Sequence, residues 1–335
     1  MKRIVLAIAV LIGLTLGAWK ASAQAEITVK EAVQAVGLSN DDIAKVKSGE
    51  VVARDMSETT ASMLAQGIIA LVKAPPGELA EAAIAADTYK RDPSVIAYGK
   101  IDPNNIEASF AEAVFTEKEA DEVKRLRDAS PGSEFNLSSD EFKALKAAVD
   151  GGAESVEALS KVYRQFLVDR AKAYISGGLG AIAPYDRGGD TVSPAADLKA
   201  ALEAATALKK VAPELYDAFL NYPKDKPEGV EETFLWLKAT VEDRPTFALE
   251  HRMVYPGESM VVYLARQYFV GQSYDDLQEI AGAFPTDAGT AVLYGNRTMT
   301  DQVAGFMQDT RHSVGRGMMR DELVAKFEAL RKKYK

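Results

Sequence analysis

The sequence predicts an α+β protein with a curved antiparallel sheet and a long C-terminal helix. Two observations predict this class. Strand-like segments occur near both ends of the chain, and a long helical stretch separates them. A parallel sheet needs a crossover helix between neighbouring strands, and these strands do not alternate with helices. A doubly wound parallel sheet is therefore not expected.

The first part of the chain contains strand-like runs. β-branched and apolar residues fill stretches of strand length at 49–56, 63–72 and 95–101, after a short helical segment at 29–47. Ala74-Pro75-Pro76 ends the second run, and Pro76 suits the start of a helix. Ala, Leu and Glu continue that predicted helix over 78–86.

The middle of the chain has helical spacing. Helices are predicted over 116–128, from 138 onward, and over 154–175, 195–208 and 213–222. The longest of these carries Leu159, Tyr163 and Phe166 on one face at three- and four-residue steps, so it should be buried along that face. Gly177-Gly178 then marks its end.

Strand character returns in the last third. Strands are predicted over 233–239, 245–255, 259–270 and 290–296. Pro256-Gly257-Glu258 is typical of a hairpin, so the strands on either side of it should pair antiparallel. Residues 273–283 are predicted to form a short helix or a loop, and 300–335 a long terminal helix.

The first 23 residues are typical of a cleavable secretory signal. Lys2 and Arg3 precede an uncharged apolar run from Ile4 to Ala18, and Ala21-Ser22-Ala23 follows as a small-residue cleavage site. The run is shorter than the roughly 20 residues that span a bilayer core, and no Cys follows it for lipid attachment. A periplasmic or secreted protein is expected, without stable membrane insertion after cleavage behind Ala23.

Composition limits the partners. The chain has no Cys, which excludes disulfides, thiol nucleophiles and Cys-based metal sites. Its net charge is −9, and removing Lys2, Arg3 and Lys20 with the signal makes it −12. Acidic charge spread over the chain argues against nucleic acid as a partner.

Two stretches carry a resemblance to a known fold family. The run Ile68-Ile69-Ala70-Leu71-Val72-Lys73-Ala74-Pro75-Pro76 leads into a helix, and Tyr294-Gly295-Asn296-Arg297 leads toward the long terminal helix. This resembles the START-like helix-grip fold, and the layout also resembles a group of uncharacterised exported bacterial proteins. The resemblance implies that the last helix lies across a curved sheet and encloses a cavity. It also implies a helix-grip-like domain over 24–101 and 228–335, with 102–227 as a helical insertion.

Motifs of common catalytic sites are missing from the sequence. His251 and His312 are the two histidines, and neither has a metal-ligand spacing. His251 follows Glu250 on a predicted strand, which points the two side chains to opposite faces. There is no nucleophile elbow, Walker loop or dinucleotide-binding glycine motif. No catalytic residue, metal or cofactor is therefore assigned.

Polar residues are densest on the apolar strands of the last third. Strand alternation places Arg266 and Tyr268 on one face, and Tyr294 and Asn296 on one face. With His251, these residues are the predicted ligand-binding set, because a few polar groups in an apolar cavity are usual for a small-molecule site. The alternative is structural: Arg266 pairs with a carboxylate, and the tyrosines pack with their hydroxyls at the rim.

These observations favour a protein that binds a hydrophobic small molecule or lipid between the curved sheet and its helices. Two rivals stay open. One is an enzyme in the same cavity that uses His251, or a Tyr and Arg pair, as acid or base. The other is an envelope scaffold with a filled core and an exposed apolar patch.

Overall fold

The computed structural model describes residues 39–334, apart from 87, 88, 91, 133, 258, 259 and 306. The predicted signal segment, 1–23, and most of the predicted helix at 29–47 lie outside the described residues. In the part of the chain that is described, no helix is both long enough and apolar enough to cross a membrane.

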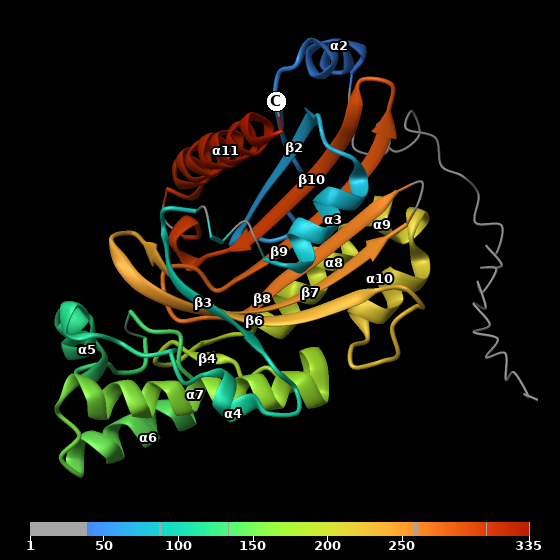
Figure 1. The fold of residues 1–335 in the computed structure, drawn as a ribbon. Coiled ribbons are helices and arrows are strands. Elements are labelled where there is room, and N and C mark those ends of the chain that lie inside the picture. The colour runs from blue at the N-terminus through green and yellow to red at the C-terminus, as the bar shows by residue number, and fades with distance from the viewer. Residues whose placement is uncertain are drawn as a thin grey trace, which may run out of the picture.

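Eight antiparallel strands form one curved sheet (Figure 1). Their order across the sheet is β1-β2-β10-β9-β8-β7-β6-β3. The strands are β1 (Val52–Asp55), β2 (Met63–Val72), β3 (Val95–Ile101), β6 (Glu231–Val241), β7 (Arg244–Pro256), β8 (Val261–Val270), β9 (Asp276–Thr286) and β10 (Gly289–Met299). The short strands β4 (Tyr185–Asp186) and β5 (Thr191–Val192) pair separately. The predicted α+β class is confirmed.

Helices lie on both sides of the sheet. They are α2 (Asn40–Ser48), α3 (Pro76–Ile84), α4 (Ile106–Ser109), α5 (Ala120–Arg127), α6 (Ser139–Asp150), α7 (Val156–Gly177), α8 (Pro194–Glu203), α9 (Thr206–Val211), α10 (Pro213–Leu220) and α11 (Gln308–Lys333), with short 3-10 helices at Glu117–Glu119, Gly178–Ala181 and Asp301–Val303. Figure 1 shows α3 and α11 against one face, and the helices between β3 and β6 on the other side.

Strand alternation gives each face its own apolar core. On the face toward α3 and α11, here called the α11 face, Ile68 and Val292 pack with Leu323 and Phe327 of α11. On the other, called the α7–α10 face, aromatic residues of the strands pack on α7, and Met253 and Leu264 pack on α8 and α10. Both sides of the sheet are therefore covered, which explains why its central strands are buried along nearly their whole length.

The strands agree closely with prediction except for β9. β2 and β3 have the predicted bounds, and β7 and β8 pair antiparallel across the predicted hairpin. The prediction of a helix or loop at 273–283 is wrong, because β9 pairs with both β8 and β10 there. Its sequence is poor in β-branched residues, so its pairing partners on both sides determine the strand.

The terminal helix begins later than predicted. β10 continues to Met299, so Asn296 lies within the strand, and α11 begins at Gln308. The helix passes close to β2, since a Cβ atom added at Gly315 would lie 2.9 Å from Cδ1 of Leu64. Only His312, Leu323 and Phe327 of α11 are buried among the residues whose burial is described. The helix therefore lies on the sheet with a narrow contact.

The longest helix between β3 and β6 ends where predicted. α7 stops at Gly177, and Gly178 has a φ of 60°. A Cβ at this position would lie 1.7 Å from the carbonyl oxygen of Tyr222. Only glycine fits this close approach, which brings the end of α7 against the segment that follows α10.

Candidate functional site

A network of polar side chains crosses the α11 face. On β7, Arg252 donates from Nε to Glu250, and its Nη1 donates to the carbonyl oxygen of Ala83 at 3.0 Å. The hydroxyl of Tyr89 donates to Oε2 of Glu250 at 2.5 Å, and Gln267 donates to the same oxygen at 3.3 Å. Glu250 and Arg252 are both buried. Their charges compensate each other inside the fold.

Glu279 on β9 is the second acid of this network. The hydroxyls of Tyr263 and Tyr294 donate to its two carboxylate oxygens at 3.0 and 2.6 Å. Asn296 donates to the hydroxyl of Tyr294 at 3.2 Å. Burial, and then the charge of Glu250, raise the pKa of Glu279. This carboxyl group is therefore more easily protonated than an exposed one.

The network continues from β10 onto β2. Gln66 lies directly opposite Asn296 in the sheet, and it donates from Nε2 to Oδ1 of Asp55 on β1 at 2.6 Å. Its side chain is fully buried, yet Oε1 has no hydrogen-bond partner among the described residues. We call the series Glu279, Tyr294, Asn296 and Gln66 the polar strip. It ends in an acceptor that a ligand or a water molecule can use.

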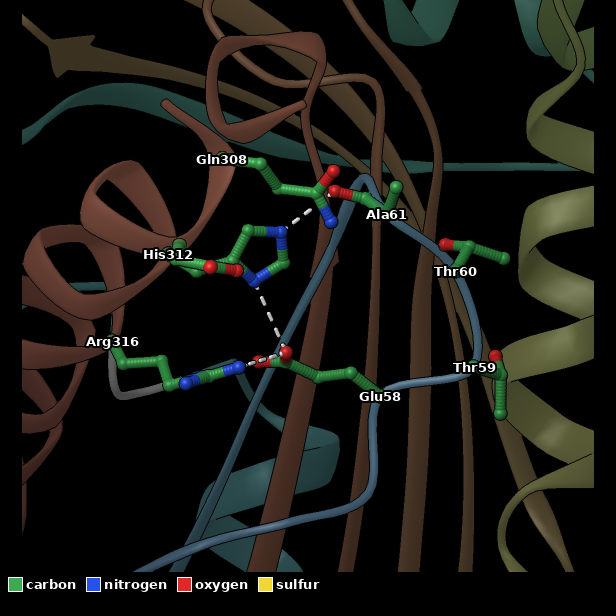
Figure 2. A pocket seen from close by; sticks show the side chains of 8 residues that line it. Glu58, Thr59, Thr60, Ala61, Gln308, His312 and Arg316 are labelled. Atoms are coloured by element: carbon green, nitrogen blue, oxygen red, sulfur yellow. Dashed lines mark hydrogen bonds and ion pairs between the residues drawn. The ribbon is translucent and has the colours of Figure 1, made fainter. Parts of the chain in front are cut away.

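An open cleft lies where α11 begins (Figure 2). It has a volume of about 550 Å³ and lies between the loop before β2 and the first turns of α11. Arg316 donates from Nε to Glu58 at 2.8 Å, and His312 contacts Glu58 through Nδ1 at 3.1 Å. Nε2 of His312 donates to the carbonyl oxygen of Ala61 at 2.7 Å. These contacts connect the start of α11 to the loop.

The structure divides the predicted ligand-binding residues between the two faces. Tyr294 and Asn296 lie together on the α11 face, whereas His251, Arg266 and Tyr268 lie together on the α7–α10 face. The register confirms that Tyr294 and Asn296 share a face. Tyr268 lies at an irregularity in the pairing of β7 with β8, and its stacking on Tyr174, which also contacts His251, places it on the α7–α10 face. The five side chains do not converge on one point, because the sheet separates the two groups.

His251 is enclosed. Its side chain has no exposed surface, its Nδ1 lies 2.7 Å from the hydroxyl of Tyr174, and its Nε2 lies 3.0 Å from Glu232. Burial lowers the pKa of His251 to about 4, although the hydrogen bond with Glu232 opposes this. The ring is therefore neutral at pH 7, with Nε2 donating to the carboxylate and Nδ1 accepting from the tyrosine.

Among the described residues, Arg266 does not make the ion pair of the structural alternative. It donates from Nη2 to the carbonyl oxygen of Phe219 in α10, and its guanidinium lies 3.6 Å above the ring of that residue. Among the described residues, no carboxylate pairs with it, and its Nε and Nη1 have no partner. Tyr268 stacks on Tyr174 at 3.8 Å, and its hydroxyl has no partner within the same part of the chain. Tyr268 also lines a smaller cavity of about 160 Å³ beside Arg170.

The prediction missed most of the α11-face network. Glu250 and Arg252 alternate on an otherwise apolar strand, and that spacing could have marked them as a buried pair on one face. Glu279 was hidden in the segment wrongly predicted as helix or loop. Glu58 and Tyr89 lie in loops, and only the folded chain brings them to their partners.

Comparison of the chain with protein-family models, with curated proteins and with solved structures finds no match.

Proposed function

We propose that this is an exported protein that binds a small amphipathic molecule, a lipid or another hydrophobic compound with one polar group, between the curved sheet and α11. The polar strip carries the proposal. It lies within an apolar wall that includes Ile68 and Val292, and it is covered by a helix with a narrow contact. A few oriented polar groups in apolar surroundings are the usual composition of a small-molecule site.

The polar group of the ligand binds the strip. Tyr294 and Glu279 present a hydroxyl and a carboxyl at the centre of the face, and Oε1 of Gln66 supplies a free acceptor. The apolar part lies against the wall now covered by Leu323 and Phe327 of α11. Burial of that part contributes roughly 25 cal/mol for each Å² removed from water.

The ligand reaches this site by an outward movement of α11. The helix is held at its start by the contacts of His312 and Arg316 with the loop at Glu58, and farther along by Leu323 and Phe327. Elements with few buried contacts are those that open most readily. The cleft of Figure 2 marks the place where the opening begins.

The direct test is native mass spectrometry of protein purified from its own cell envelope, followed by extraction of the bound molecule. A co-purifying amphipathic compound is expected. In a binding assay with that compound, Tyr294→Phe and Glu279→Gln should weaken binding at least tenfold. Tyr255→Phe is the matched control, because Tyr255 packs on the α7–α10 face. A mass equal to that of the protein alone, or equal binding by all three variants, would contradict the proposal.

An engineered crosslink tests the route. The chain has no cysteine, so Leu64→Cys with Gly315→Cys creates a single pair where α11 passes close to β2. The oxidised protein should bind the compound much more slowly than the reduced protein. Equal rates would show that the ligand does not pass beneath α11.

Acid–base catalysis in the same place is a second candidate, favoured by the raised pKa of Glu279 between two tyrosine hydroxyls. The two functions differ in the fate of the ligand. A carrier returns the extracted compound unchanged after incubation with fresh protein. An enzyme converts it, and Glu279→Gln stops the conversion.

A further inference from the structure

A second group of polar side chains crosses the α7–α10 face. In the register of the sheet, His251 lies opposite Arg266, Arg266 opposite Gln278, and Gln278 opposite Arg297. These four residues form one row across β7, β8, β9 and β10, and all four are buried. Neighbouring strands are about 4.8 Å apart, so the Cα atoms of the two arginines are about 10 Å apart, with Gln278 on the strand between them.

In the part of the chain that the structure describes, neither arginine of the row has a counter-ion. Within the described residues, Arg266 pairs with no carboxylate, and the side chain of Arg297 makes no hydrogen bond or ion pair at all. Arg266 is fully buried and Arg297 is 4% exposed. Burial lowers the pKa of both guanidinium groups. A buried arginine nevertheless keeps its proton, so two positive charges remain inside the fold.

No carboxylate of the described residues makes an ion pair with either arginine. His251 is neutral at pH 7, as its lowered pKa shows. Asp276 lies two residues before Gln278, and burial, followed by the charge of Asp197, raises its pKa well above the usual value. Its carboxyl is therefore more easily protonated than an exposed one, and neither of its oxygens has a hydrogen-bond partner among the described residues. Glu232 on β6 is hydrogen-bonded to His251, so it lies beyond the His251 end of the row.

The row also has an unused acceptor and donors that point to a ligand. Nε of Arg297 and both Nε and Nη1 of Arg266 are buried donors without partners in the described part of the chain, and the same holds for the acceptor Oε1 of Gln278. Burying a charge without a partner costs several kcal/mol. A bound anion offsets that cost at both arginines together.

We propose that the row Arg266–Gln278–Arg297 binds a small dianionic oxyanion of the phosphate type beneath α8 and α10. Phe219 of α10 lies over Arg266, and Ala201 of α8 packs against Met299, two residues beyond Arg297. Two guanidinium groups match two negative charges, and their planar N–H groups suit oxyanion oxygens. This site is separate from the α11 face, since the sheet lies between them.

The first test uses inorganic phosphate and the mature protein, purified in phosphate-free buffer. At constant ionic strength and low millimolar concentration, phosphate should raise the thermal midpoint with a saturable dependence. Sulfate has the same charge but no O–H group to donate to Oε1 of Gln278, so it should raise the midpoint less. Chloride should not raise it. If acetate raises the midpoint as much as phosphate, the site takes a monoanion and the proposal is wrong. No response to either dianion would also overturn it.

Variants locate the effect. Arg297→Met should abolish the phosphate-dependent increase, while in phosphate-free buffer it should melt at or above the wild-type midpoint because an uncompensated charge is gone. Arg320→Gln is the control, because Arg320 is exposed and pairs only with the adjacent Asp321 among the described residues. It should respond as the wild type does. An equal response of Arg297→Met and wild type would show that phosphate acts elsewhere.

Discussion

Arg252 on the α11 face is bonded to Glu250, whereas Arg266 and Arg297 on the α7–α10 face have no carboxylate among the described residues. All three guanidinium groups are buried in the same sheet. The difference lies in the neighbours. β7 supplies an acid two residues from Arg252, while the nearest acid on the same face of β9, Asp276, makes no ion pair with Arg297 in the described part of the chain. Arg252 is thus paired within the fold, whereas Arg266 and Arg297 are the two arginines for which we propose a bound anion.

The largest expected effect is the removal of the compensating acid. Glu250→Gln leaves Arg252 buried without a counter-ion, so the free energy of unfolding should fall by about 3–5 kcal/mol. Urea denaturation measures it. Glu328→Gln, which removes the half-exposed partner of Arg331, should cost less than about 1 kcal/mol. Equal losses would show that the pair at Glu250 is not special.

The next effect depends on pH. Asp275 adjoins β9 and pairs with Arg187, yet burial and the charge of Asp301 raise its pKa to about 7. The folded protein then holds this proton more tightly than the unfolded chain does. The contribution of Asp275 to the free energy of unfolding is therefore fully present below about pH 4. It is lost as the pH rises toward 7, and the loss amounts to at most about 4 kcal/mol.

Asp275→Asn isolates that contribution. Its free energy of unfolding should decline less than that of the wild type between pH 4 and 7. The wild type is the reference because His251 also changes the free energy of unfolding with pH. Its pKa is lowered to about 4 in the folded protein and is near 6.5 in the unfolded chain, so its contribution to stability increases with pH between these values. Parallel profiles for the two proteins would contradict the raised pKa of Asp275.

A smaller effect of opposite sign is expected on the α7–α10 face. In phosphate-free buffer, Arg266→Met removes a buried charge with two unpartnered donors, so the free energy of unfolding should rise by about 1–3 kcal/mol. Urea denaturation measures this change. A loss of several kcal/mol would mean that the contacts with Phe219 outweigh the buried charge, and the contrast between the faces would disappear.

The smallest effect is expected at the cleft. Arg316 is half-buried and bonded to Glu58, so Arg316→Gln should lower the free energy of unfolding by about 0.5–1 kcal/mol. It should increase hydrogen exchange in the first turns of α11 more than in β2. Uniform changes in both elements would show that this pair does not hold the helix locally.

The sequence predicted the fold better than the site. Strands with β-branched runs, such as β2 and β8, were found because their pattern is local, while β9 was missed because its neighbours determine it. Strand alternation predicts that Arg266 and Tyr268 share a face of one strand, and that Tyr294 and Asn296 share a face of another. Alternation alone does not relate the faces of different strands, so the separation of the two groups required the register.

The segment from α4 to α10 joins two strands that are direct neighbours. β3 pairs with β6, and Ile101 at the end of one lies opposite Phe234 near the start of the other. In topological terms, the whole helical segment is therefore an enlarged hairpin turn, and a short turn could join the strands instead. Such a shortened chain would keep every ladder of the main sheet, but it would expose the aromatic side that Phe166 and Tyr174 now cover. The helices are thus not needed to connect the two strands, and they cover apolar surface of the kind through which proteins associate when it is exposed.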